Sequence, residues 1–196
     1  GLSDSIHKQI DASYYPDGWR RYMARAIKEA FPDKIVMTSG NIRNPQSACE
    51  ILENQDADLI GMGRQTIANP SWSHKVKTGK IDEIRQCISC NIGCAGHRIG
   101  LNRPIRCTVN PDVFYDDFYK KKKVNKKTNV VVIGGGTAGL EAACTASEVG
   151  CTTFLIEKEK TLGGLARQIS QIPEKTRIAH FPKYLEKRVE KLHDLF

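Results

Sequence analysis

Apolar residues recur at helix and strand spacing in the first third of the chain. Those between Trp19 and Phe31 fall three or four residues apart, which predicts one face of a helix. The stretches KIVMTSG (34–40) and ADLIGMGR (57–64) are typical of short buried strands that end in glycine. Between them, NPQSACEILENQ (44–55) predicts a helix with Asn44 as its N-cap and Pro45 in the first turn. Helix and strand alternating over short connections predict β/α units feeding a parallel sheet.

The last third repeats this β/α rhythm. NVVVI (129–133) predicts a strand, GGGTAG (134–139) a turn and LEAACTASEVG (140–150) a helix. TTFLIE (152–157) predicts a second strand, and apolar positions from 178 to 192 have helical spacing. A loop-rich, cysteine-bearing segment separates the two patterns. Because each pattern supplies only two clear strands, we expect the chain to be an internal segment of a longer polypeptide.

Composition narrows the class of protein. The chain has 196 residues, of which 40% are hydrophobic, so it can bury a core. It has neither an apolar run of about 18 residues nor a secretory signal pattern, so we expect no membrane association. The net charge of +8 owes much to six lysines at 120–127. Because no aromatic residues interrupt that run, we interpret it as a solvated linker and not as a nucleic-acid site.

Seven cysteines do not suggest a secreted protein. Their number is odd, and Cys49, Cys144 and Cys151 lie in helix or strand patterns, where they are most simply small core residues. This usage differs from the disulfide framework of small secreted domains. We therefore expect a reducing, cytoplasmic location.

The remaining four cysteines are spaced C-x2-C-x3-C-x12-C. Thiolates at such spacing bind zinc or iron–sulfur clusters. A zinc ribbon usually has a second C-x2-C pair, whereas only one cysteine follows here, so a [4Fe–4S] cluster is favoured over zinc. Glycines at 93, 96 and 100 supply turns, and His97 is interpreted as a bystander. The predicted ligands are Cys87, Cys90, Cys94 and Cys107.

The glycine turn after the strand at 129–133 has the form G-x-G-x-x-G. Gly134 permits a tight turn, Gly136 lets a pyrophosphate approach the backbone, and Gly139 permits close helix–strand packing. Glu157 ends the next strand, where a carboxylate can accept hydrogen bonds from ribose hydroxyls. This context predicts dinucleotide binding, and LGG (162–164) is expected to lie against the cofactor.

A second phosphate site is suggested near the start of the chain. Gly40 and Asn41 follow one predicted strand, and Gly63 and Arg64 follow the next. In a TIM barrel the loops after strands seven and eight commonly bind phosphate, and an arginine can contact it bidentately. Ordinary turn glycines and a surface arginine would give the same sequence pattern. The pattern therefore does not decide between a phosphate site and an ordinary turn.

The order of these segments resembles a known family. SGNIRNP, ADLIGMGRQTIANPSW, CISCNIGC with CTVNP, and VVVIGGGTAGLEAA together are similar to the two-flavin iron–sulfur branch of the old yellow enzyme family. That branch includes 2,4-dienoyl-CoA reductase, 2-enoate reductase and trimethylamine dehydrogenase. The resemblance implies an α/β chain in three parts. These are the C-terminal part of an FMN-binding TIM (β/α)8 barrel (1–80), an iron–sulfur loop and linker (81–128), and the start of a Rossmann-like FAD/NAD(P)-binding domain (129–196).

The resemblance also implies roles for single positions. Gly40, Asn41, Gly63 and Arg64 match FMN-phosphate positions, and the four clustered cysteines match the ligands of a [4Fe–4S] cluster. Leu165 stands where dienoyl-CoA reductases commonly have Gln, so FAD and ADP both stay open for the second nucleotide. The positions matching the adenine-dinucleotide site are Gly134, Gly136, Gly139, Glu157 and Gly164.

The activity implied is NAD(P)H-dependent reduction of activated C=C bonds in 2-enoates, enones or 2,4-dienoyl-CoA esters. Electrons would pass from NAD(P)H to FAD, to the cluster, to FMN and to substrate. The alternatives are an amine dehydrogenase of the trimethylamine dehydrogenase type and, outside enzymes, a basic zinc-binding module. The catalytic residues are expected outside this chain, which by itself should be inactive. Oligomeric state stays undecided, with a homo-oligomer open.

Overall fold

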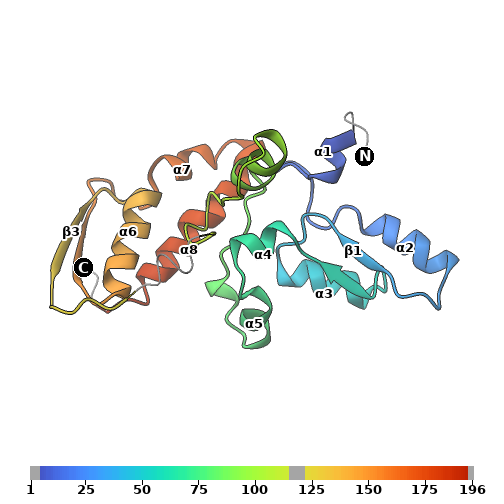
Figure 1. Cartoon of the computed structure of the whole chain (residues 1–196), viewed down its shortest axis with the longest axis horizontal. Helices are drawn as coiled ribbons and strands as arrows, with labels where there is room; N and C mark the ends of the chain where they lie inside the picture. The colour runs from blue at the N-terminus through green and yellow to red at the C-terminus, as the bar shows by residue number, and fades with distance from the viewer. Residues whose placement is uncertain (1–4, 115–121, 194–196) are drawn as a thin grey trace. The chain divides into compact units, whose positions relative to one another are not determined.

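The computed structural model describes residues 5–114 and 122–193, and its contacts divide the chain into two compact units (Figure 1). The first unit comprises Gly1–Ile81 and Gln86–Val113, and the second comprises Asp82–Arg85 and Phe114–Phe196. Lys120 and Lys121, at the start of the lysine run, lie outside the described residues. Each unit is considered by itself below.

The first unit is built from short helices around a parallel strand pair. Strands β1 (Met37–Ser39) and β2 (Leu59–Gly61) pair with Met37 opposite Leu59. The short 3-10 helix η2 (Ile81–Glu83) lies where the chain passes from this unit into the second, which takes Asp82–Arg85. The other helices are α1 (Ile6–Gln9), α2 (Arg21–Ala30), α3 (Pro45–Glu53), α4 (Arg64–Ala68), α5 (Trp72–Lys77) and the π-helix η3 (Ile92–Gly100).

Helix α3 shows how the sequence specifies these elements. Its N-cap is Asn44, whose side-chain oxygen accepts a hydrogen bond from the Gln46 N–H at 2.9 Å, and a proline opens its first turn, as predicted. The helix turns Ala48 and Ile51 into the core. The adjacent Cys49 therefore faces outward, and its prediction as a core residue was wrong. Cys144 and Cys151 are buried, as expected.

The cysteine segment is more ordered than the loop-rich prediction. Its π-helix η3 begins with a hydrogen bond from the Gly96 N–H to the Asn91 carbonyl at 2.7 Å. The chain returning through Arg106 lies against the helix, since the Arg106 N–H donates to the Gly93 carbonyl at 2.6 Å. A Cβ on Gly93 would lie 2.7 Å from the Arg106 carbonyl oxygen, so the missing side chain permits this close approach.

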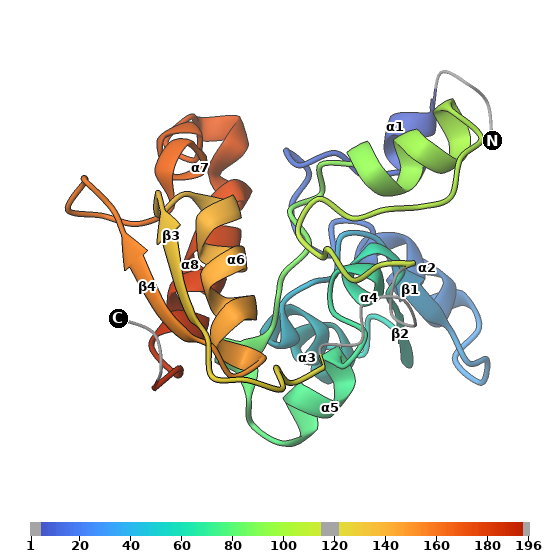
Figure 2. The same ribbon diagram turned by 60° about the vertical axis from the view of Figure 1, so that its left-hand side comes forward.

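The second unit is a parallel strand pair covered by helices (Figure 2). Strands β3 (Asn129–Ile133) and β4 (Thr152–Ile156) are joined by α6 (Thr137–Glu148), which packs on both strands and on α8 (His180–Val189). Leu140 and Leu185 are fully buried between these elements. Between β4 and α8 lie α7 (Gly164–Ile169) and the 3-10 helix η4 (Pro173–Ala179).

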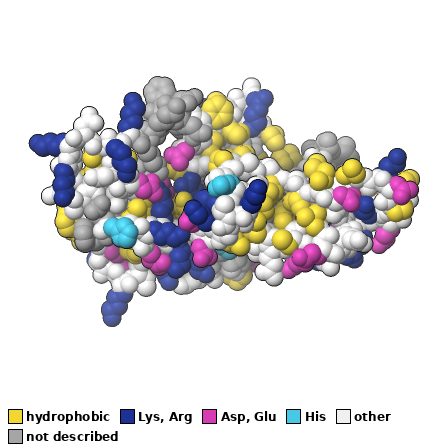
Figure 3. Space-filling view, turned by 90° about the horizontal axis from the view of Figure 1, so that it is seen from below, with side chains coloured by type: hydrophobic (Ala, Val, Ile, Leu, Met, Phe, Trp, Pro, Cys, Tyr) yellow, Lys and Arg dark blue, Asp and Glu magenta, His cyan; other side chains and the backbone are white. Residues whose placement is uncertain are grey.

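Both units confirm the prediction of a mixed α/β chain with parallel strands. No helix within the described ranges is long and apolar enough to cross a membrane. Large apolar side chains reach the surface of the first unit, including Ile35, Met37 and Leu59, and the right-hand part of Figure 3 shows hydrophobic side chains gathered there.

Candidate cofactor sites

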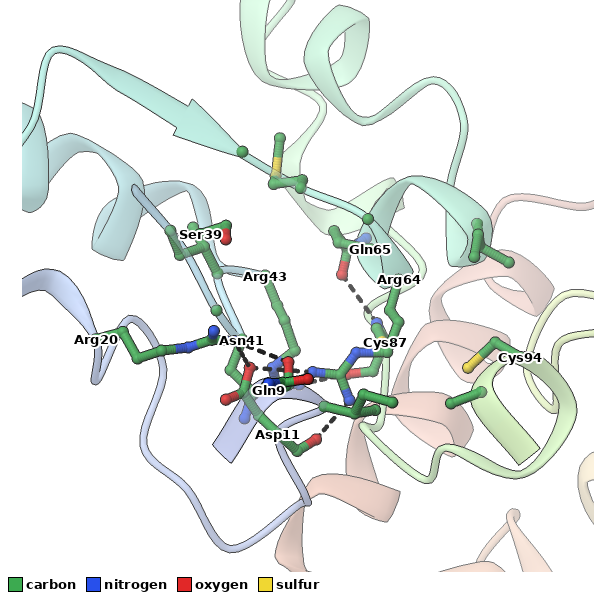
Figure 4. A pocket seen from close by; sticks show the side chains of 18 of the residues that line it. Gln9, Asp11, Arg20, Ser39, Asn41, Arg43, Arg64, Gln65, Cys87 and Cys94 are labelled. Atoms are coloured by element: carbon green, nitrogen blue, oxygen red, sulfur yellow. Dashed lines mark hydrogen bonds and ion pairs between the residues drawn. The ribbon is translucent and has the colours of Figure 1, made fainter. Parts of the chain in front are cut away.

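A cavity of about 390 Å³ lies in the first unit, beside the carboxyl ends of β1 and β2 (Figure 4). Parallel strands bring the segments after their carboxyl ends to the same edge, which is where α/β proteins bind ligands. The structure thus brings together all four residues for which the sequence predicts phosphate contacts. These cavity-lining residues are Gly40, Asn41, Gly63 and Arg64.

The cavity carries an excess of positive charge. Asp11 is its one carboxylate in the described lining, and four arginines line it with that residue. Asp11 is buried and accepts hydrogen bonds from the Trp19 indole N–H at 2.7 Å and from Arg20 at 2.9 Å. Asp17, outside the lining, pairs with Arg43, so two carboxylates face four guanidinium groups and the remaining positive charge favours an anion such as a phosphate. The arginines are Arg20, Arg43, Arg64 and Arg98.

Arg64 is held firmly within this cavity. One terminal nitrogen donates to the Asp11 carbonyl and to the Asn91 side-chain oxygen, both at 2.5 Å. The other donates to the Asn41 side-chain oxygen at 3.1 Å and to the Asp11 carboxylate at 3.3 Å. Figure 4 shows Arg20, Arg43 and Arg64 converging near Asn41 and Asp11. The guanidinium is therefore oriented by the protein before any ligand contacts it.

The sequence predictions missed Asp11, Arg20 and Arg43. The Arg20 Nε is buried without a hydrogen-bond partner, next to Gly40, whose Cβ would lie 2.6 Å from it. Gly40 also has a φ of 127°, which side chains rarely adopt. Arg43 is buried and forms a bidentate ion pair with Asp17 at 3.0 Å. No spacing pattern marks these residues, because each reaches the cavity from a different segment.

The four predicted metal ligands line a second, smaller cavity in the first unit. Burial raises the pKa of the Cys87 and Cys107 thiols, while hydrogen bonds from backbone N–H groups oppose that effect. The Ser89 N–H lies 3.4 Å from the Cys87 Sγ, and the Cys90 Sγ lies 3.2 Å from the Thr108 hydroxyl. Hydrogen bonds to sulfur are among the features that tune iron–sulfur clusters.

Zinc and an iron–sulfur cluster would place different demands on these four cysteines. Zinc holds four ligands about 2.3 Å from one centre, which draws thiolates close together. Among the described residues, no three His, Cys, Asp or Glu side chains are grouped closely enough to hold one metal ion. The four cysteines line one cavity, and the [4Fe–4S] cluster inferred from their spacing stays a prediction.

The glycine turn of the second unit is closed tightly. A Cβ on Gly139 would lie 1.8 Å from the Gly134 carbonyl oxygen, so no other residue fits there without moving the turn. The Gly163 N–H donates to the Gly135 carbonyl at 2.8 Å, and Gly164 brings its backbone against Gly136. The predicted dinucleotide residues of the turn and of the LGG segment therefore lie side by side.

Glu157 sits beneath this turn, at the end of β4. Its carboxylate accepts hydrogen bonds from the Gly135 N–H at 2.6 Å and from the Glu159 N–H at 2.9 Å. These donors, led by Glu159, lower the pKa of the carboxyl group and keep it ionised. A carboxylate oxygen has two lone pairs, so each can still accept a bond from a ribose hydroxyl. Leu165, the departure from the family pattern, is exposed nearby on α7.

Two protein-family models match the chain. The NADH:flavin oxidoreductase / NADH oxidase family matches residues 3–83, and the FAD dependent oxidoreductase family matches residues 129–190. A NADH oxidase of Thermoanaerobacter brockii is 41% identical over 95% of this chain and 29% of its own length. A bilirubin reductase of Mediterraneibacter gnavus is 36% identical over 86% of this chain and 26% of its own, and a cinnamate reductase of Clostridium sporogenes is 34% identical over 67% and 20%.

Solved structures of two enzymes are similar to this chain in fold. A histamine dehydrogenase from Rhizobium sp. 4-9 superposes with a TM-score of 0.87 at 26% identity, over 95% of this chain and 27% of its own. A 2-naphthoyl-CoA reductase superposes with a TM-score of 0.86 at 26% identity, over 92% and 27%. The chain thus spans less than a third of these relatives. It belongs to the old yellow enzyme-like family of NADH:flavin oxidoreductases with two flavins and an iron–sulfur cluster.

Proposed function

We propose that this chain is the cofactor-joining part of an NAD(P)H-dependent flavin and iron–sulfur oxidoreductase that reduces activated C=C bonds. The substrate class would be 2-enoates, enones or 2,4-dienoyl-CoA esters. Relatives named for the reduction of cinnamate, bilirubin and 2-naphthoyl-CoA support this choice over other flavoenzyme reactions. In this proposal residues 1–80 form the end of an FMN-binding TIM barrel, 81–128 the cluster loop and linker, and 129–196 the start of a Rossmann-like nucleotide domain.

The observation that carries the proposal is the adjacency of the two cavities in the first unit. Arg64, Ile67, Cys87 and Cys94 line both of them, so a thin wall of side chains separates a phosphate-binding cavity from a cavity lined by four cysteines. Neither a zinc ribbon nor an isolated flavin domain needs such an arrangement. An enzyme that exchanges single electrons between a cluster and a flavin does need it.

The chain's own residues would hold and orient the cofactors. Arg64 and Arg20 would balance the charge of the FMN phosphate, with the backbone at Gly40 and Gly63 close to its oxygens. The four cysteines would hold a [4Fe–4S] cluster, and Glu157 with the glycine turn would hold the adenosine part of FAD or ADP. When bound, FMN supplies hydride chemistry, FAD accepts hydride from NAD(P)H, and the cluster carries single electrons between them.

The second candidate is an amine dehydrogenase. The histamine dehydrogenase structure superposes on 95% of this chain, so the shared architecture serves amine oxidation as well. In that reaction the electrons run outward from substrate, and NAD(P)H is not the donor. The part of the enzyme that contacts substrate is expected outside the present chain, so these residues alone do not distinguish the two directions.

An anaerobic assay of the intact protein separates the candidates. We expect oxidation of NADH or NADPH to depend on an added enoate such as cinnamate or on a 2,4-dienoyl-CoA. Amine-dependent reduction of an artificial acceptor, with no response to enoates, would replace the first candidate with the second. About four irons per chain and broad absorbance near 400 nm are expected. A colourless protein with one zinc would contradict both candidates.

A further inference from the structure

Residues 87, 89 and 91 lie in the stretch that carries the first two predicted cluster ligands. Each forms hydrogen bonds with side chains that line the cavity beside β1 and β2, the phosphate cavity. The Cys87 N–H donates to the Gln65 side chain at 2.9 Å, and Arg43 donates to the Cys87 carbonyl at 2.6 Å. Two residues on, the Ser89 hydroxyl donates to the Asn41 side-chain oxygen at 2.7 Å. The side chains that bind this stretch all line the phosphate cavity: Asn41, Arg43, Arg64 and Gln65.

Asn91 is the third point of attachment: it lines the cysteine cavity and bonds to Arg64, which lines both cavities. Its side-chain oxygen accepts from Arg64, and its amide group donates to the Asp11 carbonyl at 3.2 Å and to the Ile10 carbonyl at 3.4 Å. Its own carbonyl accepts the first hydrogen bond of η3, the helix that carries Cys94. One residue therefore connects the cavity arginine to the backbone that positions a cluster ligand.

The backbone conformation of Asn91 allows it to make both sets of contacts. Its φ is 59°, in the left-handed region, which asparagine tolerates better than most residues do. From this position the side chain points to Arg64 while the main chain turns into η3. Both terminal nitrogens of Arg64 bond to protein acceptors, and Asn91 is one of them. A phosphate that contacts Arg64 in this orientation therefore also holds its hydrogen bond to Asn91 in place.

We propose that Asn91 is a positioning residue that couples occupancy of the flavin-phosphate cavity to retention of the iron–sulfur cluster. A bound phosphate restrains the already oriented Arg64 guanidinium further, Arg64 in turn restrains the Asn91 side chain, and Asn91 holds the start of η3 against opening. The same linkage runs in reverse, because coupling between two binding sites is reciprocal. This inference rests on the proposed function, since it takes FMN and a cluster as the two occupants.

Asn102 provides a matched control. It lies in the same cysteine segment and also has a left-handed φ, of 47°, but it lines neither cavity and accepts its hydrogen bond from Arg98, an exposed arginine of the phosphate cavity, instead of from Arg64. Glycine adopts positive φ without strain, so Asn91→Gly and Asn102→Gly each remove a side chain and leave the backbone conformation allowed. Asn91→Asp keeps the acceptor for Arg64 but loses the amide donor to the Ile10 and Asp11 carbonyls, so it isolates the bond to Arg64.

The test measures iron release from the intact holoenzyme to a chelator under anaerobic conditions. Each variant is loaded with FMN or with riboflavin, which lacks the phosphate, and flavin affinity is measured in parallel. We expect FMN to slow iron release about tenfold relative to riboflavin in the unaltered protein. The ratio should persist in Asn102→Gly and Asn91→Asp and should fall to about one in Asn91→Gly.

The outcomes separate this inference from the proposed function. If FMN binds more tightly than riboflavin but Asn91→Gly keeps the full ratio, the coupling is refuted and the phosphate site stands. The coupling through Arg64 is also refuted if the ratio of iron-release rates falls to about one in Asn91→Asp, which keeps the acceptor for Arg64. If FMN and riboflavin bind equally, the phosphate site itself is wrong, and the inference is refuted with it.

Discussion

Replacing Gly93 with alanine should disturb the cysteine cavity while leaving the rest of the first unit folded. Gly93 lies in η3, between the second and third cysteines of the spacing, where the chain returning through Arg106 crosses it. The added Cβ would lie 2.7 Å from the Arg106 carbonyl oxygen, 2.9 Å from its carbonyl carbon and 3.3 Å from the Cys107 nitrogen. All three atoms are main chain, so no side-chain rotation can relieve the contact.

The size of the effect follows from this geometry. Forcing a methyl group against a fixed backbone costs about 1–3 kcal/mol. The chain at Arg106 must move away, and Cys107, the next residue, moves with it out of the cavity. Because alanine is favoured over glycine in a helix interior by up to about 1 kcal/mol, the same substitution without a contact should be neutral or stabilising.

Gly100 offers that comparison, because it ends the same helix and a Cβ there would meet no atom within 4 Å. The assay is iron and sulfide content of anaerobically purified holoenzyme, together with the half-life of the absorbance near 400 nm under chelator. We expect Gly93→Ala to lose the cluster at least about fivefold faster than Gly100→Ala, from the lower bound of about 1 kcal/mol. Equal half-lives would refute the argument that this crossing shapes the ligand set.

Three further outcomes follow from the second unit. Gly139→Ala should weaken dinucleotide binding at least about tenfold in a fluorescence titration, because its Cβ would lie 1.8 Å from a backbone oxygen. The lowered pKa of Glu157 means that its stabilisation is present above the unfolded pKa and lost as pH falls through the folded one; thermal melts of Glu157→Gln and the unaltered protein should differ at pH 7 and converge only at acidic pH below the ordinary Glu pKa. Arg188→Met should lower the free energy of unfolding in denaturant by about 2 kcal/mol, because the largely buried Arg188 pairs with two carboxylates; Lys187→Met, which removes an exposed pair, should cost under about 0.5 kcal/mol.

Most elements were predictable because their signals are local. The strand at 129–133 and the N-cap at Asn44 appear where the sequence places them, since strand alternation and capping depend on residues within one or two turns. The π-helix at 92–100 was missed for a related reason. Its backbone depends on the return of Arg106 past Gly93, far along the segment, which no local pattern shows.

The sequence by itself determined the class of protein and the residue types of each site: cysteines at cluster spacing, a glycine turn with its distal acid, and glycines after two strands. Only the tertiary structure decided what surrounds them. Asp11, Arg20 and Arg43 reach the phosphate cavity from separate segments, and Asn91 ties that cavity to the cysteines. A sequence motif reflects interactions between residues that are close in the chain. The charge balance and the coupling of a site depend on residues that only folding brings together.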